Sequence, residues 1–292
     1  MQAIRVLICA LCLSCPLLQA LPRLEDFEKI VESKRAKVGL AILCEGEEPI
    51  LLNNKDSYPL MSVFKLHVAI SAMDKMRREK ISLDEKIFVK ACDMQRDTFS
   101  PLLKKYPNCD FEISLKELLE AALALSDNNA CDILIKFAGG IEKIDAYIRS
   151  LGIDGFKLSE TEASMHADIA KSYSNRSSPL ALARLLEKVY TKDILSAEQL
   201  KFLKETLASA KTGSDKLRAG LPPTVRLEHK TGHSARTPSG LRIAENDAGV
   251  FYLPDGRRCY IAVFVKDSLE SDSDNAKIIA DIAKLSYEGL LE

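Results

Sequence analysis

The chain has 292 residues, of which 47% are apolar and 28% are charged, and its formal net charge is −1. That length is enough for one large domain or two small ones with a sizeable core. The near-zero net charge argues against nucleic acid or an anionic membrane surface as a partner, because both attract strongly basic proteins.

The first twenty residues have the pattern of a secretory signal peptide. Arg5 precedes an apolar run over residues 6–13, and Ala20 suits a cleavage site. Two alternatives are a lipoprotein signal with Cys15 as the lipidated residue and an uncleaved anchor. The residues before Cys15 match a lipidation motif poorly, and the apolar run is shorter than the ~20 residues of a membrane span. We therefore expect residues 1–20 to be removed from a secreted or periplasmic protein without stable membrane insertion.

Strand patterns lie near both ends of the chain. The predicted strands are residues 38–43, 49–52, 225–229, 250–253 and 259–265. Asp255-Gly256 predicts a hairpin turn between the last two. Apolar residues recur at helical spacing over residues 24–31, before the first strand, and over residues 276–291, after the last strand. Strands from the two chain ends therefore predict one antiparallel sheet with terminal helices on it.

Helix signals dominate the middle of the chain. Ser114, Ser178 and Ser196 are candidate N-caps, and Gly139 suits a helix end. We predict an α/β (α+β) fold. Its sheet domain comprises residues 21–58 and 209–292, and residues 59–208 form an inserted all-helical domain. A cleft between two such parts is a usual place for a site.

Three short motifs carry the chemistry. The first is Ser62-Val63-Phe64-Lys65, in which Ser and Lys lie three residues apart on one helix face. A Ser hydroxyl needs a nearby base to act as a nucleophile, and a Lys amine is such a base when its pKa is lowered. The alternative is an ordinary helix start capped by Ser62.

The second motif is Ser126-Asp127-Asn128, directly after a helix. Ser126 would relay a proton and Asn128 would hold a polar substrate group. Alternatively, the three residues are only a cap and a turn.

The third motif is Lys230-Thr231-Gly232, at the end of the strand 225–229. Lys230 and Thr231 would bind an anion, and Gly232 allows close backbone approach. The alternative is a strand that runs into a polar turn. A second copy, residues 211–213, follows a helix and is interpreted as a turn at the end of that helix.

The three motifs in this order and context resemble a class A serine β-lactamase. The resemblance runs from about residue 38 to the C-terminus. It implies a β-lactamase/transpeptidase-like fold, a small β-lactam substrate and a monomer. It also implies a loop Glu, for which Glu160 and Glu162 are candidates; the distance of Glu162 from Ser126 matches the family spacing.

Other positions follow or depart from the family pattern. Met165-His166 resembles a divergent, cephalosporinase-like branch that carries His where most members carry Asn. Glu160 and Asn175 stand where most members have an Arg–Asp pair, so that salt bridge is expected to be absent. Phe99 matches the aromatic residue at the site rim, with plain packing as the alternative.

The resemblance implies the following roles. Ser62 attacks the lactam carbonyl, and the backbone N–H groups of Ser62 and His233 form the oxyanion hole. Lys65, or Glu162 through a water, accepts the Ser62 proton, and Glu162 activates water for deacylation. The predicted substrate-binding residues are Phe99, Asn128, His166, Lys230, Thr231, Gly232 and His233. A further cation is expected among Lys216, Arg236 and Arg242.

No metal or other cofactor is expected, because the four His residues have no zinc-ligand spacing. Two alternatives to the hydrolase remain open. A penicillin-binding D,D-peptidase shares the three motifs, but Glu162 argues against it. A non-catalytic β-lactam sensor would need a transmembrane or signalling segment, for which the sequence gives no sign.

Five cysteines lie beyond the predicted signal, so at least one has no partner within the chain. Cys131 and Cys259 fall in apolar patterns and are expected to be buried. Cys92 and Cys109 flank a polar stretch and are a candidate pair.

Overall fold

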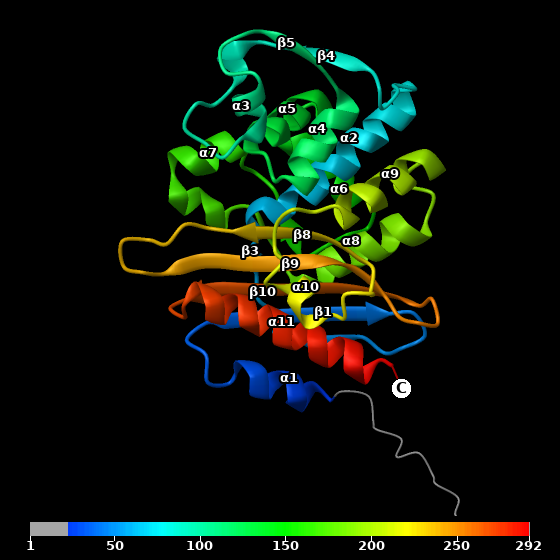
Figure 1. The fold of residues 1–292 in the computed structure, drawn as a ribbon, viewed down its shortest axis with the longest axis vertical. Helices are drawn as coiled ribbons and strands as arrows, with labels where there is room; N and C mark the ends of the chain where they lie inside the picture. The colour runs from blue at the N-terminus through cyan, green and yellow to red at the C-terminus, as the bar shows by residue number, and fades with distance from the viewer. Residues whose placement is uncertain (1–22, 292) are drawn as a thin grey trace, which may run out of the picture.

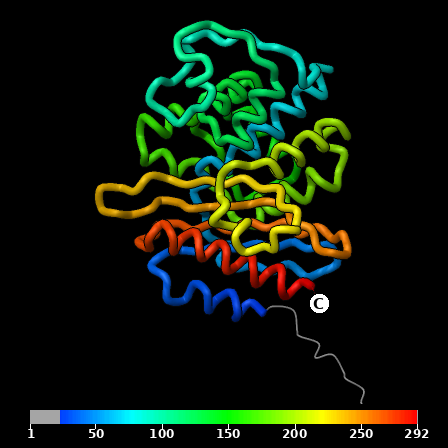
Figure 2. Tube along the Cα trace, in the orientation of Figure 1, coloured from blue at the N-terminus to red at the C-terminus, as the bar shows by residue number. Residues whose placement is uncertain are grey.

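The fold is that of a computed structural model, which describes residues 23–291; the predicted signal peptide lies outside them. Five antiparallel strands form the main sheet in the order β2-β1-β10-β9-β8. Their bounds are β1 (Lys37–Cys44), β2 (Ile50–Leu52), β8 (Leu227–His233), β9 (Arg242–Tyr252) and β10 (Arg258–Ser268). The first and last segments of the chain run side by side, because β1 pairs with β10 along its whole length (Figures 1 and 2). The sheet predicted from both chain ends is confirmed.

Each strand faces two cores, because successive side chains point to opposite faces. On β1, Leu40 and Ile42 contact one apolar cluster, and Ala41 and Leu43 contact the other. The first cluster lies under α1 (Leu24–Val31), α10 (Leu217–Gly220) and α11 (Asp272–Gly289). The second lies under the helical body on the other side of the sheet (Figure 1).

The inserted segment is mainly helical, but the prediction that it is all-helical is wrong, because it also carries short strands. Its helices are α2 (Lys65–Glu79), α3 (Pro101–Lys105), α4 (Leu115–Ala124), α5 (Asn128–Ala138), α6 (Ile141–Ser150), α7 (Glu162–Ala167), α8 (Pro179–Thr191) and α9 (Ala197–Ala208), with 3-10 turns η1 (Met61–Phe64), η2 (Ala91–Asp93) and η3 (Ile169–Tyr173). Its strands are β4 (Lys86–Val89) with β5 (Phe111–Ser114), and β3 (Tyr58–Pro59) with β6 (Phe156–Lys157) and β7 (Arg176–Ser177).

The predicted helix starts are confirmed in atomic detail. Ser114 and Ser196 each accept a hydrogen bond from the residue three positions later and form capping boxes. Ser178 caps α8, which has Pro179 in its first turn. Gly139 ends α5 with φ +95°, a backbone conformation that favours glycine.

The cysteines pair differently from the sequence-based candidate. A disulfide joins Cys44 to Cys259, which are directly opposed on β1 and β10. Cys92 and Cys109 are exposed and have no disulfide partner among residues 23–291, so the candidate pair is wrong. Sequence spacing missed the real pair because its members lie 215 residues apart and meet only through strand register. Cys131 and Cys259 are buried, as expected.

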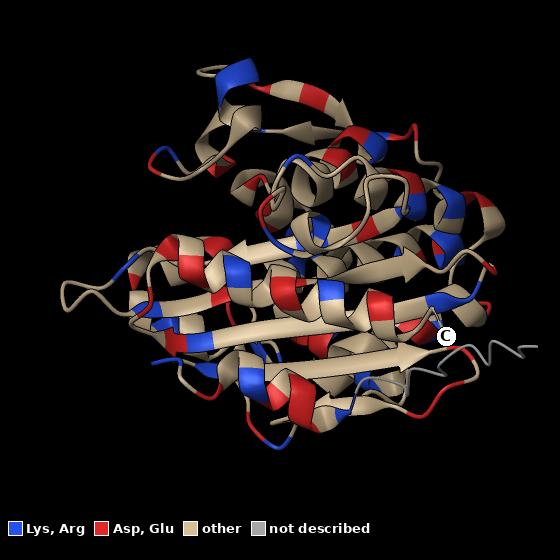
Figure 3. Cartoon of the chain, turned by 60° about the horizontal axis from the view of Figure 1, so that its bottom comes forward, with Lys and Arg blue, Asp and Glu red and all other residues tan. Residues whose placement is uncertain are grey.

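Figure 3 shows that basic and acidic residues are interspersed along α11, whereas the strands of the main sheet are largely free of charged residues. No helix within residues 23–291 is both long and apolar enough to cross a membrane.

The buried His67 should make stability depend on pH. The residue is 1% exposed, its Nδ1 has no hydrogen-bond partner among residues 23–291, and burial lowers its pKa from 6.5 to about 4. Its stabilising contribution is therefore complete above the unfolded-state pKa and is lost as pH falls from 6.5 toward about 4. We expect wild type to lose about 2 kcal/mol more unfolding free energy than His67→Leu between about pH 7.5 and about pH 5.

Urea unfolding of both proteins at the two pH values measures this difference. The Leu variant is the matched comparator, because the carboxyl groups titrate in both proteins. Parallel losses in the two proteins would show that His67 does not sense pH.

Candidate active site

Ser62 and Lys65 lie where η1 meets α2, at the centre of the molecule. The Lys65 Nζ donates to the Ser62 Oγ at 2.7 Å and to the Asn128 Oδ1 at 2.8 Å. It also lies 2.5 Å from the Glu162 Oε1. Lys65 is fully buried, so its charge depends on these three oxygen partners. The structure thus brings together four residues that the sequence analysis selected from the first two motifs and from the loop that carries Glu162.

Strand β8 approaches the backbone around Ser62 unusually closely. A Cβ on Gly232 would lie 2.6 Å from the Leu60 carbonyl oxygen and 2.9 Å from the Ser62 nitrogen. Only glycine fits without a backbone shift. The strand continues through the third motif to His233, four residues beyond its predicted end, and this places the Gly232–His233 peptide beside Ser62.

Ser126 and Lys230 form a second hydroxyl–amine pair. The Lys230 Nζ donates to the Ser126 Oγ and to the Thr231 carbonyl oxygen, both at 2.9 Å. Ser126 has φ +61°, a strained backbone conformation for a non-glycine residue. Burial, together with the nearby Lys65 charge, lowers the pKa of Lys230 to about 7.

The motif residue between Ser126 and Asn128 has a structural task. Asp127 is fully buried and caps α5 by accepting the Ala130 N–H at 2.9 Å. It also accepts the Ser100 hydroxyl at 2.9 Å. Asn128 donates to the Thr98 Oγ1 at 2.9 Å, which orients its amide oxygen toward Lys65. Asp127 is therefore a helix cap, as the alternative interpretation of this motif predicts. This role does not conflict with the contacts that Ser126 and Asn128 make with the two buried lysines.

The loop that carries Glu162 is held by side chains that bind backbone groups. Asn175 accepts the N–H groups of Ser159 and Glu160 at 2.9 and 3.0 Å. Asp132, which the sequence analysis missed, accepts those of Glu162 and Ala163, each at 2.8 Å. Burial raises the pKa of Asp132 to about 6.

The family's ion pair is absent at this loop, as expected. Glu160 instead lies 3.5 Å from the Lys171 Nζ and accepts the Ser164 hydroxyl at 2.6 Å. Its carboxylate therefore packs within the loop and does not contact Lys65.

Ser62 lies where two hollows meet. The smaller, about 270 Å³, is lined by Ser126, Thr212 and Thr231. The larger, about 520 Å³, is lined by Glu162, His166 and Met165 among others. Phe99, Asn128 and His233 line both. Phe99 is 60% exposed, which favours a rim position over plain core packing. His166 is half-exposed, and its Nε2 lies 3.7 Å from the Asp97 Oδ2.

Residues 23–290 match the model of the Beta-lactamase enzyme family. The chain belongs to this family. It is 45% identical over 274 residues to a β-lactamase of Bacteroides uniformis, covering 93% of both chains. It is 36% identical to the extended-spectrum β-lactamase PER-1 of Pseudomonas aeruginosa, covering 90% of this chain and 86% of that one.

Solved structures agree with this assignment. A class A β-lactamase from Bacteroides cellulosilyticus superposes with a TM-score of 0.89 at 42% identity, covering 91% of this chain and 96% of that one. The TLA-3 extended-spectrum β-lactamase gives 0.90 at 40% identity, covering 92% and 98%. The predicted class A resemblance and fold are therefore confirmed.

In this β-lactamase, two of the three candidate cations, Lys216 and Arg242, contact the residue that pairs with His233 on the neighbouring strand. Glu245 pairs with His233 across β8 and β9, and it lies 3.2 Å from the Lys216 Nζ and 3.5 Å from the Arg242 Nε. Arg236 donates instead to Asp272 and the Glu270 carbonyl, on the outer side. Arg242 also contacts Asp272 through its Nη2, so which of the three cations assists the substrate stays a prediction.

The second Lys-Thr-Gly copy lies against the first. No strand leads into it, as predicted, but the Thr212 Oγ1 lies 2.7 Å from the Thr231 Oγ1. Gly213 has φ +78°, and a Cβ there would lie 2.4 Å from the Thr231 methyl group. The sequence analysis missed Thr212 as a lining residue, although the repeated motif was a visible signal.

Gly232→Ala should impair the site while the fold survives. The added methyl must displace backbone around Ser62, and a displacement of about 1 Å near a reacting group costs roughly 100-fold in rate. Gly256→Ala is the matched control, because its Cβ would meet nothing within 4 Å although its φ is +90°.

Hydrolysis of a chromogenic β-lactam, the reaction for which the family is named, measures both variants, and thermal unfolding shows that each is folded. A folded Gly232→Ala protein with wild-type kcat/KM would contradict the close approach.

Proposed function

We propose that this protein hydrolyses β-lactams through an acyl-enzyme on Ser62. One observation carries the proposal: a single buried amine, Lys65 Nζ, lies 2.7 Å from the Ser62 hydroxyl and 2.5 Å from the Glu162 carboxylate. The Lys65 amine is thus within proton-transfer distance of both a hydroxyl nucleophile and a second base.

In acylation, the Ser62 Oγ forms a bond to the lactam carbonyl carbon. Its proton passes to Lys65 or, through a water, to Glu162. A charged Lys65 must first release a proton, and Glu162 is the nearest carboxylate. The carbonyl oxygen becomes negative and accepts the N–H groups of Ser62 and His233, which the closeness of Gly232 to Ser62 supports.

The lactam C–N bond then breaks, and the ring nitrogen takes a proton from the Ser126 Oγ. Lys230 supports this role, because its Nζ donates to that hydroxyl at 2.9 Å and can replace the proton. A Lys whose pKa is about 7 gives up a proton readily near neutral pH.

The two hollows suit the two sides of a bicyclic β-lactam. The smaller one would hold the substrate carboxylate against Lys230 and Thr231, with Lys216 or Arg242 adding positive charge from behind His233. The larger one would hold the acylamino side chain against Asn128, Phe99 and His166. Cephalosporins are our first choice of substrate; the word extended-spectrum in the names of PER-1 and TLA-3 is compatible with it.

Deacylation distinguishes this proposal from the peptidase alternative. Glu162 accepts a proton from water, the water oxygen bonds to the acyl carbon, and Ser62 regains its proton as the ester bond breaks. The 10% exposure of the Glu162 side chain and its contact with Lys65 support this role. A peptidase or sensor would not need a carboxylate here.

We also propose export to the periplasm or beyond as a monomer. The signal pattern of residues 1–20 supports export, although it lies outside the described residues. The Cys44–Cys259 disulfide supports it independently, because disulfides persist mainly in oxidising compartments.

Ser62→Ala tests the nucleophile. We expect no turnover and no covalent product, because no hydroxyl remains to form the ester. Intact-protein mass spectrometry after incubation with penicillin measures the adduct, and wild type is the reference. A penicilloyl adduct on the folded variant would assign the nucleophile to another residue.

The two loop glutamates provide the second test. General-base assistance to water contributes about 10²–10⁴-fold. Glu162→Ala should therefore give a burst of about one equivalent followed by very slow turnover, if Lys65 still activates Ser62. Glu160→Ala is the matched control and should retain steady turnover, because Glu160 contacts Lys171 and Ser164.

Stopped-flow hydrolysis of a chromogenic cephalosporin separates the burst from steady turnover. The opposite result for the two glutamates would overturn the role of Glu162. A long-lived adduct on wild type with every β-lactam would favour the peptidase or the sensor.

A further inference from the structure

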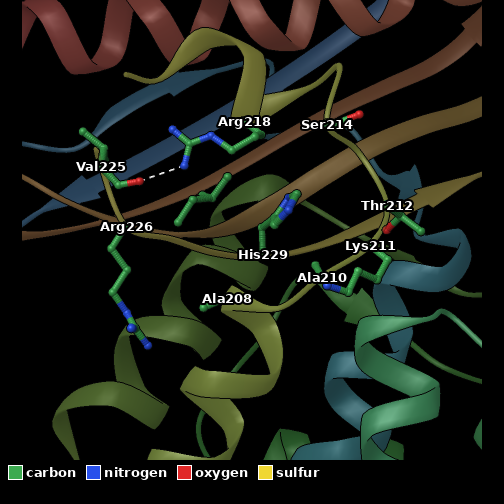
Figure 4. A pocket seen from close by; sticks show the side chains of 10 residues that line it. Ala208, Ala210, Lys211, Thr212, Ser214, Arg218, Val225, Arg226 and His229 are labelled. Atoms are coloured by element: carbon green, nitrogen blue, oxygen red, sulfur yellow. Dashed lines mark hydrogen bonds between the residues drawn. The ribbon is translucent and has the colours of Figure 1, made fainter. Parts of the chain in front are cut away.

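A separate cavity of about 280 Å³ lies beside the catalytic hollows, along the same strand β8 (Figure 4). We call it the Lys211 cavity. It is lined by Lys211, Thr212, Ser214, Arg218, Arg226 and His229, with apolar residues at its base. Thr212 also lines the smaller catalytic hollow and is the wall between the two spaces. The proposed hydrolysis uses none of the charged groups of this cavity.

The charges around the Lys211 cavity do not cancel. Arg226 is paired with the buried Glu228, its Nε lying 2.5 Å from the Oε1. Arg218 donates only to backbone carbonyls, including that of Val225 at 2.7 Å, and forms no ion pair within residues 23–291. The exposed Lys211 side chain has no hydrogen-bond or ion-pair partner in the same part of the chain. No carboxylate lines the cavity, so two cations there are not neutralised.

The His229 ring adds a hydrogen-bonding group to this cavity, and a carboxylate fixes the orientation of the ring. Its side chain is 7% exposed, and its Nδ1 lies 2.9 Å from the Asp247 Oδ1. Asp247 also accepts the Leu217 N–H at 3.2 Å and thereby ties α10 to the sheet. The second ring nitrogen of His229 has no partner among the described residues, and the ring lies between Arg218 and Thr212 in the close view (Figure 4). When the Nδ1–H donates to this carboxylate, the neutral ring presents Nε2 to the cavity as a hydrogen-bond acceptor.

We propose that the Lys211 cavity binds a small dianionic oxyanion, of which inorganic phosphate is the probe. Monohydrogen phosphate has acceptor oxygens for an ammonium, a guanidinium and the hydroxyls of Thr212 and Ser214, and it has one O–H group that can donate to the His229 Nε2. The cavity has room for one phosphate with some water and is too small for a bicyclic β-lactam with its side chains. The second Lys-Thr-Gly copy thus has a ligand of its own.

Isothermal titration with phosphate at constant ionic strength tests this site, with chloride as the control anion. Wild type should show saturable phosphate binding. In Lys211→Ala, one of its binding sites should be lost or should bind phosphate about tenfold more weakly, which is the effect expected for one charge-assisted hydrogen bond. Lys211→Arg should keep the site. Lys201→Ala, which removes an exposed lysine from neighbouring α9, is the matched control and should bind as wild type does.

The catalytic hollow also attracts anions through Lys230, so the titration is repeated with Lys230→Ala. The Lys211 site should persist in that variant. Loss of all binding in Lys230→Ala with unchanged binding in Lys211→Ala would place the anion in the catalytic hollow and overturn the proposal. Absence of saturable binding in wild type would overturn it as well. None of these outcomes depends on whether the protein hydrolyses β-lactams.

Discussion

A fully buried ammonium group, Lys65 Nζ, is the constraint on which the centre of this structure depends. A buried charge is tolerated only when it is paired and hydrogen-bonded. The partners of Lys65 are Ser62, Asn128 and Glu162, which come from three distant segments of the chain. Removing one partner of a buried charged group typically costs about 3–5 kcal/mol. The same contacts that stabilise Lys65 therefore bring together the proposed nucleophile and the proposed bases, so structural and chemical requirements coincide in this proposal.

The second buried amine supports the proposal that the site binds an anionic substrate. Burial lowers the pKa of Lys230, and the nearby Lys65 charge lowers it further, to about 7. Without a bound anion, a charged Lys230 is thus only marginally favoured near neutral pH. A substrate carboxylate beside it would stabilise the charged form, because an opposite charge within a few ångströms favours ionisation. Binding and the protonation state of Lys230 are consequently linked.

Features that depend on local sequence patterns were predicted better than features that depend on long-range contacts. The three-residue spacing of Ser62 and Lys65, the capping serines and the β9–β10 hairpin all depend on neighbours within a few positions, and all are confirmed. The Cys44–Cys259 disulfide depends on strand register across 215 residues, and Asp132 meets the loop of Glu162 from another helix. Thr212 meets Thr231 only because a turn folds back on β8. Propensity and spacing carry no information on such meetings.

The Glu162 loop is anchored by Asn175 where most family members have an ion pair, and this difference changes how the anchor responds to pH and salt. An Arg–Asp ion pair holds its strength only while both groups stay charged, and salt screens it where it is exposed. Asn175 replaces this with neutral amide contacts: it accepts two backbone N–H groups and donates to the Glu160 carbonyl oxygen at 2.8 Å. Because Asn175 is fully buried and does not titrate, its contacts do not depend on pH or ionic strength. The charge-dependent contact of the anchor is that of Asp132, whose pKa burial raises to about 6. Burial penalises the ionised form of this carboxyl group more than the N–H groups of Glu162 and Ala163 favour it, so acidification through that pH relieves the burial penalty and does not by itself release the loop.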